Sequence, residues 1–212
     1  METAIIGLGN IGKQVALNLI AGGQDVIVAD RGPAKATDFA KASEGKARAA
    51  SVAAAIEAAD IIVFAVYFNA IKDLIGEYRG KLAGKIVVDP SNPIAPDGSG
   101  GFKKIIPKDQ SSGQLLAKLM PPGAKLVKAF GSLAAASLKT GARRVPEPNV
   151  LFYASDDREA GNAVADLIRV SGFAPLRVGG IDQSIRIEVF GDLHEFGKLG
   201  KPVTAREASA LV

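Results

Sequence analysis

Residues 4–12 read Ala-Ile-Ile-Gly-Leu-Gly-Asn-Ile-Gly and hold a G-x-G-x-x-G pattern between an apolar strand and a helical pattern. In such a turn we expect Gly7 to make the sharp reversal and Gly9 to let the backbone approach a pyrophosphate. Gly12 would let the following helix pack closely on the strand. With a strand before it and a helix after it, the pattern predicts a dinucleotide-binding turn rather than an ordinary glycine-rich turn.

The residues after the turn are expected to complete the phosphate site. The free N–H groups of Asn10, Ile11 and Gly12 would face an anion at the positive end of a helix dipole. An acidic residue, Asp30, stands near the end of the next apolar stretch, where such folds carry an acid that bonds the ribose. The turn and the acid together predict a site for NAD(P).

The composition limits the chemistry. The 212 residues suffice for one large domain, or one domain with a small appendage, and the hydrophobic content of 48% supports a substantial core. The absence of cysteine excludes disulfides, thiol catalysis and metal–thiolate sites, and the single histidine argues against a histidine-rich site, so we expect no metal. The net charge of +4 is scattered, which is typical of a solvated surface and predicts no nucleic-acid partner.

Insertion into a membrane is not expected. The longest apolar run, residues 61–68, is far too short to span a bilayer. No charged-then-apolar leader precedes the first strand, which starts almost at Met1. These features predict a cytoplasmic protein without a membrane partner.

Short apolar stretches alternate with helical patterns and predict the fold class. Several are continuous rather than alternating, as expected for parallel strands covered on both faces. We predict an α/β fold with a doubly wound, mainly parallel sheet (Rossmann) and a small C-terminal helical extension. Residues 1–180 would form the dinucleotide-binding domain, and 181–212 a helix and tail completing the substrate side. The predicted strands are 3–6, 25–30, 46–50, 60–66, 85–89, 125–129, 149–154 and 174–179.

Two stretches depart from this alternation. Residues 90–113 contain four prolines and a glycine-rich run with little periodicity, which predicts a loop near the active site or a disordered connection. Residues 181–199 carry one apolar stripe at helical spacing. They predict a helix packed on the sheet, or on a partner subunit in a homodimer.

The residues around the second strand end bear on the choice of cofactor. Asp30 can accept hydrogen bonds from both ribose hydroxyls of NAD, and it would repel a 2′-phosphate. Arg31 could stack on adenine and reach a phosphate, and Lys35, four residues later on a predicted helix, would point to the same place. Two cations against one anion slightly favour NADP(H) over NAD(H).

The carboxyl ends of the other strands should surround the nicotinamide, because ligands of open parallel sheets bind beyond these ends. Asn92 could bond the nicotinamide ribose or carboxamide, or it could only close a local turn. The Phe130-Gly131-Ser132 segment would bring a flat face and bare backbone close to a ring-shaped reactant and so form a substrate pocket. The residues placed around the cofactor at these ends are Ala65, Val66, Asn92 and Pro93.

The single histidine is a candidate proton donor. On a helix over 181–199, His194 would share a face with Arg186 and Phe190, although a lone histidine is often structural. No Ser-His-Asp, Lys-Tyr or paired-carboxylate pattern emerges from the sequence. Reduction of a carbonyl would need a visible proton donor, whereas hydride transfer between two ring cofactors needs mainly their alignment.

Several segments together resemble the deazaflavin (coenzyme F-420)-dependent NADP oxidoreductase family, whose fold also serves as the reductase domain of certain membrane ferric reductases. The resemblance extends over nearly the whole chain. It implies a Rossmann domain that binds NADP(H) and passes hydride to or from a flavin or deazaflavin ring. The matching segments are the Gly7–Gly12 turn, the Arg31 and Lys35 pair, residues 87–93, residues 127–130 and residues 153–157.

The sequence is also compatible with two other functions. One is a small hydroxyacid or imine dehydrogenase, although such enzymes add a long helical domain, and this chain continues as strand, helix and strand after residue 140. The other is a non-catalytic module that senses the dinucleotide. A sensor would have no use for a ring-sized pocket at residues 130–132, so an open pocket there would favour the enzyme.

Overall fold

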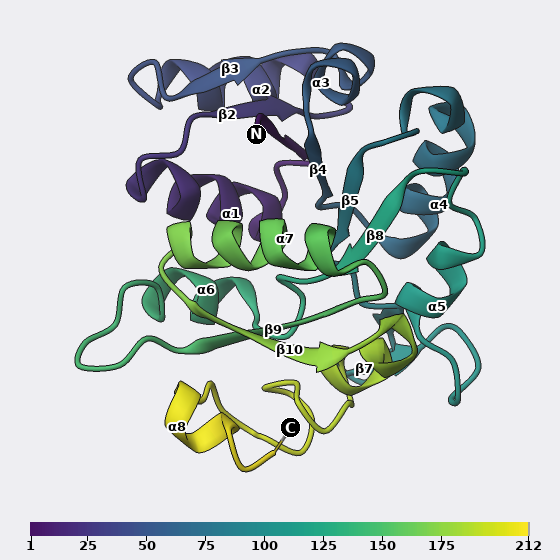
Figure 1. The fold of residues 1–212 in the computed structure, drawn as a ribbon, viewed down its shortest axis with the longest axis vertical. Coiled ribbons are helices and arrows are strands. Elements are labelled where there is room, and N and C mark those ends of the chain that lie inside the picture. The colour runs from purple at the N-terminus through teal and green to yellow at the C-terminus, as the bar shows by residue number, and fades with distance from the viewer. Residues whose placement is uncertain (212) are drawn as a thin grey trace.

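The computed structural model describes residues 1–211, and its centre is one eight-stranded sheet (Figure 1). The strand order is β10-β9-β8-β5-β4-β1-β2-β3. All neighbouring strands pair in parallel except β8 and β9, which are antiparallel. The strands are β1 (Thr3–Ile6), β2 (Val26–Ala29), β3 (Ala47–Ala49), β4 (Ile61–Phe64), β5 (Ile86–Asp89), β8 (Lys125–Lys128), β9 (Val150–Ser155) and β10 (Ala174–Gly179). The predicted fold class is confirmed.

Helices cover both faces of the sheet, and Figure 1 shows α1 and α7 together in front of it. Within residues 1–211, no helix has the length and apolar character needed to cross a bilayer. The helices are α1 (Asn10–Ala21), α2 (Pro33–Lys41), α3 (Val52–Ala58), α4 (Phe68–Glu77), α5 (Ser112–Ala117), α6 (Ala135–Thr140), α7 (Arg158–Val170) and α8 (Ala205–Ala208), with 3₁₀ turns η1 (Arg79–Lys81) and η2 (Ile181–Ile187).

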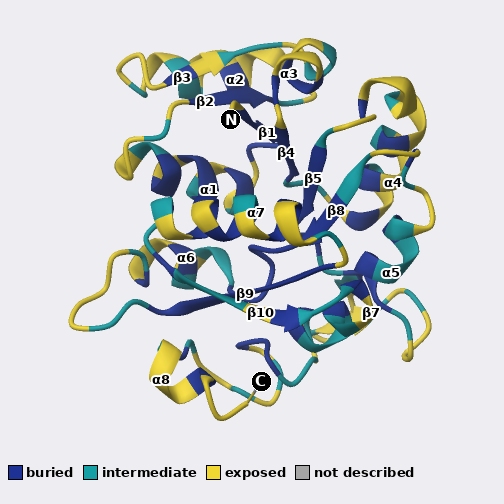
Figure 2. Cartoon of the chain, viewed as in Figure 1, coloured by how far each residue is buried: buried dark blue, intermediate teal, exposed yellow. Residues whose placement is uncertain are grey.

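The core has two halves, one on each face of the sheet. Successive residues of a strand point to opposite faces, so Val63 packs with α1 and α7 while its neighbour Ile62 packs with α3 and α4. Figure 2 shows the central strands as buried throughout. This double coverage is why the strands are continuously apolar instead of alternating.

The strand ends differ from the prediction at the carboxyl edge. The fourth strand was expected over 60–66, but β4 ends at Phe64, and Ala65 and Val66 leave the ladder. Likewise β8 ends at Lys128, one residue before the predicted end. The short strands β1, β2, β4, β5 and β8 therefore end at Ile6, Ala29, Phe64, Asp89 and Lys128, and these ends define the carboxyl edge of the sheet.

Residues 90–113 are more ordered than the loop that the sequence predicts. They contain a small antiparallel hairpin of β6 (Ile94–Pro96) and β7 (Phe102–Lys104). Its turn is closed by Asp97, whose Oδ1 accepts hydrogen bonds from the Ser99 and Gly101 N–H groups at 2.7 and 3.0 Å. The hairpin starts two residues after Asn92, which places it next to the carboxyl end of β5.

The continuous helix expected over 181–199 is wrong. The 3₁₀ turn η2 ends at Ile187, and a series of tight turns follows. A Cβ at Gly197 would lie 1.7 Å from the Gly191 carbonyl oxygen, so these two glycines pack backbone against backbone. The apolar residues of the tail still face inward, because Ile187, Leu193 and Val203 pack against β9 and β10. Of the predicted apolar stripe, Ile181 and Leu193 are buried, but Phe196 is 60% exposed, so the stripe predicted burial only in part and did not predict the backbone geometry.

Candidate functional site

The glycine turn between β1 and α1 is closed by contacts that exclude side chains at two positions. Gly7 has φ +96°, and a Cβ there would lie 2.5 Å from the Ala65 carbonyl oxygen. A Cβ at Gly12 would lie 1.9 Å from the Gly7 carbonyl oxygen. Gly9 is different, since a Cβ added there would have no described atom of another segment within 4 Å. The space over Gly9 is therefore open to a ligand.

The N-terminus of α1 presents unshared N–H groups at this opening. Gly9 is the N-cap, and within the described chain no side chain caps the helix or places an acid in its first turn. The first intrahelical bond is donated by the Lys13 N–H to the Gly9 carbonyl at 3.0 Å. The N–H groups of Asn10, Ile11 and Gly12 precede this bond and point along the positive end of the helix dipole. Such a helix end suits a phosphate.

Asp30, just beyond β2, is bonded to the glycine turn. Its Oδ2 accepts the Leu8 N–H at 2.8 Å, and its Oδ1 accepts the Gly32 N–H at 3.3 Å. The Lys35 Nζ lies 3.7 Å from Oδ2, and the side chain of Lys35 is 56% exposed. Arg31 is also exposed. The structure thus brings two cations and one partly satisfied carboxylate together at the end of β2.

At the centre of the carboxyl edge, Asn92 links three segments of the chain. Its Nδ2 donates to the Gly131 carbonyl at 3.0 Å, and its Oδ1 accepts the Val189 N–H at 2.7 Å. One N–H of the half-buried amide remains for a ligand. Ala65 and Val66, after β4, are half-buried, whereas Pro93 is buried.

Phe130, Gly131 and Ser132 are all buried, so they do not form the open pocket wall that the sequence suggests. Phe130 has φ +63° and its side chain lies inside the core. A Cβ at Gly131 would lie 2.6 Å from the Pro90 carbonyl oxygen, which leaves no room for a side chain. The covering segment is residues 188–197, which we call the C-terminal strap. The Glu195 N–H of the strap donates to the Ser132 carbonyl at 3.2 Å.

His194 lies in this strap and is only 2% exposed. Its Nδ1 accepts the Phe196 N–H at 2.9 Å, so Nε2 carries the proton that bonds the Gly131 carbonyl at 3.0 Å. Burial, the largest influence, lowers the pKa of the imidazole from 6.5 to about 4. His194 is therefore neutral near pH 7, and both ring nitrogens are engaged by backbone.

A buried ionic network that the sequence did not indicate joins the strap to the sheet. The Lys128 Nζ lies 2.8 Å from Asp89 Oδ2, 2.6 Å from Ser112 Oγ and 3.5 Å from Glu188 Oε1, and it also bonds the Ser91 carbonyl. Asp89, Lys128 and Glu188 are each at most 1% exposed. In the sequence, the feature that could have indicated this network is a charged residue at the end of each of two apolar strands. These residues are Asp89, after 86–88, and Lys128, after 126–127.

Glu195 provides a second attachment of the strap. Its Oε1 accepts a hydrogen bond from the Ala134 N–H, and its Oε2 accepts one from the Ser137 hydroxyl at 2.6 Å. The carboxylate therefore caps the N-terminus of α6. The segment that looked like a helix is instead held against the carboxyl edge by polar contacts at both ends.

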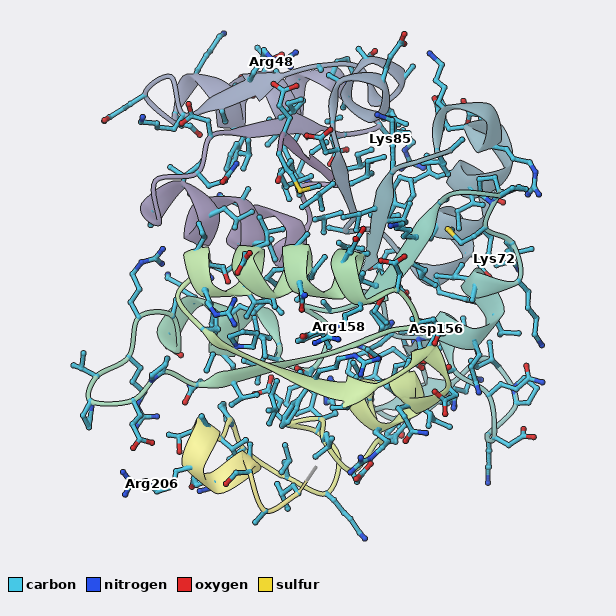
Figure 3. The ribbon with its side chains drawn as sticks, in the orientation of Figure 1. Arg48, Lys72, Lys85, Asp156, Arg158 and Arg206 are labelled. Atoms are coloured by element: carbon cyan, nitrogen blue, oxygen red, sulfur yellow. The ribbon has the colours of Figure 1, made fainter. Side chains whose placement is uncertain are left out.

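Two open hollows of about 370 and 380 Å³ lie at the opposite, amino edge of the sheet. Arg48 lines the first and Asp156 the second, and both residues are labelled in Figure 3. Neither hollow contains a residue of the glycine turn, Asp30 or the strap. The candidate site is thus the carboxyl edge, which carries the glycine turn, the two cations and Asn92.

The strand order, the glycine turn and the open end of α1 define a dinucleotide-binding protein of the Rossmann class. Residues 2–93 match the family model described as NADP oxidoreductase coenzyme F420-dependent. The N-terminal part of the chain is thus similar to that family of oxidoreductases, and the resemblance that the motifs predicted is confirmed over these residues.

Known proteins are similar over most of the chain. The rat metalloreductase STEAP3 is 28% identical over 187 residues, which are 88% of this chain and 36% of the relative. The chain thus spans about a third of that protein. The F420-dependent NADP reductase of Methanothermobacter marburgensis is 26% identical over 89% of this chain and 88% of its own. The crystal structure of a hypothetical protein, SMa0349 from Sinorhizobium meliloti, aligns with a TM-score of 0.83 at 29% identity, covering 96% of this chain and 95% of that one.

Proposed function

We propose that the protein binds NADP(H) along the glycine turn and transfers hydride between its nicotinamide and a planar acceptor ring, such as a deazaflavin or a flavin. The observation that carries this proposal is the arrangement around the glycine turn. The open face of Gly9 and the free N–H groups of α1 suit a pyrophosphate, and Arg31 and Lys35 stand where a 2′-phosphate would follow. The archaeal relative is named for the same pair of cofactors.

The residues of the site suit alignment better than acid–base chemistry. A nicotinamide supplies the hydride, and a ring acceptor takes it without a proton donor on the protein. Asn92 would orient the nicotinamide side with its remaining N–H, and the half-buried Ala65 and Val66 would pack against it. The protein then contributes mainly fixed orientation and exclusion of water.

For His194 we propose a positioning role in place of the proton transfer that the sequence suggested. Its Nε2–H holds the Gly131 carbonyl, and its Nδ1 is occupied by the Phe196 N–H. A neutral, enclosed imidazole with both nitrogens bonded has no free proton to give to a substrate. Its function is to fasten the strap over Phe130–Ser132.

One observation favours the second candidate, a non-catalytic sensor of the dinucleotide. Residues 130–132 are covered by the strap, and a sensor does not need a ring-sized opening there. In that case NADPH binding would alter the strap, and a partner would recognise the change. The dehydrogenase alternative would require a group able to protonate a carbonyl, and His194 does not meet that requirement.

The test starts with titration of the purified protein with NADPH and NADH, followed by rapid mixing of the NADPH complex with oxidised coenzyme F420 and with FMN. We expect tighter binding of NADPH and fast reduction of at least one ring. The Arg31→Ala variant should weaken NADPH and leave NADH nearly unchanged, while Arg48→Ala at the amino edge serves as a charge-matched control. Tight binding of NADPH with reduction of neither ring would favour the sensor.

A further inference from the structure

The C-terminal strap begins with a strained turn that carries an exposed aromatic ring. In Glu188-Val189-Phe190-Gly191 the Gly191 N–H donates to the Glu188 carbonyl at 2.7 Å, which closes a four-residue turn. Phe190 stands at its third position with φ +75°. This position of a type II turn is usually glycine, because a side chain is disfavoured at positive φ. Yet the phenyl side chain is present and 54% exposed.

The backbone on either side of Phe190 is anchored, so the strain is held in place. Before the turn, Glu188 Oε1 accepts the Ser112 hydroxyl at 2.8 Å inside the buried ionic network. Within the turn, the Val189 N–H is bonded to Asn92 Oδ1 at 2.7 Å. At the last position of the turn, a Cβ at Gly191 would lie 2.3 Å from the Arg186 carbonyl oxygen. Phe190 therefore has little freedom to relax.

The same contacts place Phe190 at the reacting end of the site. Its neighbour Val189 is bonded directly to Asn92, the residue that follows β5 at the carboxyl edge, and Asn92 also holds Gly131. A half-exposed phenyl ring contributes little to the core, and glycine would fit the turn better. Non-glycine residues held at positive φ tend to occur where a ligand or a switch requires them. The ring is thus suited to contact a molecule outside the chain.

We propose that Phe190 is a specificity-determining residue that stacks on the planar ring of the hydride acceptor. This inference rests on the proposed function. An aromatic face prefers an offset, parallel or edge-on contact with another ring, so it would select conjugated planar acceptors over aliphatic carbonyl compounds. The fixed turn determines the position of the Phe190 ring relative to Asn92, and the positive φ of Phe190 is the strain that this position requires.

Three variants test this role. Phe190→Leu keeps the apolar bulk but removes the aromatic face, and we expect KM for the acceptor ring to rise about tenfold while kcat and the Kd for NADPH stay within about twofold. Phe190→Tyr keeps the face and should restore the wild-type KM. Phe190→Gly relieves the turn, so its thermal midpoint should rise although its KM rises as well.

Glu44→Gly is the matched control for strain. Glu44 is exposed, has φ +50° and precedes Gly45, which lines the hollow at the amino edge. This variant should raise the thermal midpoint as Phe190→Gly does, with KM for the acceptor unchanged. A gain of stability combined with a loss of acceptor binding, seen only at Phe190, is a result that a purely structural residue would not produce.

Each other outcome has a distinct meaning. If the wild-type protein reduces coenzyme F420 or FMN and Phe190→Leu does so with the same KM, the role of Phe190 is overturned and the proposed function stands. If Phe190→Leu converts a dimer to a monomer in light scattering with KM unchanged, a second copy of the chain contacts the ring, and the role is again overturned. If the wild-type protein reduces neither ring, the proposed function itself fails and the role of Phe190 fails with it.

Discussion

Asp89 and Lys128 face each other at the carboxyl ends of the adjacent strands β5 and β8, with 2.8 Å between Oδ2 and Nζ and both side chains at most 1% exposed. Glu188 joins them from the C-terminal strap. A buried ion pair gives little net stability compared with apolar residues. Removal of one partner alone strongly destabilises the fold, however, because the other charge is left buried without compensation. The pair therefore determines where the strap can dock, more than how stable the sheet is.

We expect Lys128→Met to lower the free energy of unfolding by about 3–5 kcal/mol, because two buried carboxylates would lose their cation. Urea unfolding followed by circular dichroism measures this change. Lys81→Met is the matched control, since Lys81 forms an exposed pair with Glu57 at 2.7 Å and should leave stability unchanged within error. Equal effects of the two substitutions would show that the buried network contributes no more than a surface pair.

Alanine at Gly12 should mainly reduce stability, whereas alanine at Gly9 should mainly weaken NADPH binding. Gly12→Ala places a Cβ 1.9 Å from the Gly7 carbonyl oxygen, so we expect a loss of about 3 kcal/mol in the free energy of unfolding. Gly9→Ala meets no atom within 4 Å and should cost about 0.5 kcal/mol as a poorer N-cap, yet weaken NADPH about tenfold. Unfolding curves and a fluorescence titration separate the two effects. Unchanged NADPH affinity in Gly9→Ala would place the pyrophosphate elsewhere.

Asp30→Asn tests the balance of charge at the end of β2. Asparagine can still accept the Leu8 N–H, but the carboxylate charge beside Arg31 and Lys35 is gone. We expect NADPH to bind about threefold to tenfold more tightly, because repulsion of the 2′-phosphate falls. Asp25→Asn, at the other end of β2, changes the same charge and should have no effect. A large loss of NADH affinity with NADPH unchanged would mean instead that Asp30 binds the ribose hydroxyls.

His194 should make stability depend on pH in a defined window. The folded pKa is about 4 and the reference value is 6.5, so the unfolded chain binds the proton more readily between these values. The stabilisation is complete above pH 6.5 and is lost as the pH falls toward 4, by about 3 kcal/mol for a shift of this size. Urea unfolding of the wild type and of His194→Gln, compared at pH 7.5, 6.5, 5.5 and 4.5, isolates this contribution. Parallel curves for the two proteins would contradict it.

The local sequence was sufficient wherever a pattern involves neighbouring residues. The turn at Gly7 and Gly12, the buried strands and the position of Asp30 next to Arg31 all follow from residue type and short spacing, and the structure contains each of them. The resemblance to the NADP oxidoreductase family could be inferred for the same reason, because the part that matches the family model is residues 2–93. Strand ends were less certain, since a residue such as Val66 is equally apolar inside or just outside a ladder.

The C-terminal strap shows where such patterns are insufficient. The apolar spacing of residues 181–199, which include the strap, is compatible with a helix. The close contact of Gly191 with Gly197 and the positive φ of Phe190 produce turns instead. These contacts depend on Glu188 and Val189 meeting Ser112 and Asn92, which are more than 70 residues away in the chain. No periodicity can encode a bond between such distant segments.

The amino-acid sequence by itself determined the Rossmann sheet, the glycine turn and the cationic end of β2, because backbone conformation and burial there follow from glycine, apolar and charged residues at short spacing. Only the tertiary structure decided that His194 is buried and neutral, that Asn92 is bonded to Gly131 and Val189, and that residues 130–132 lie under the strap. Hydrogen bonding and desolvation depend on which distant segments enclose a side chain, and that enclosure exists only once the chain is folded.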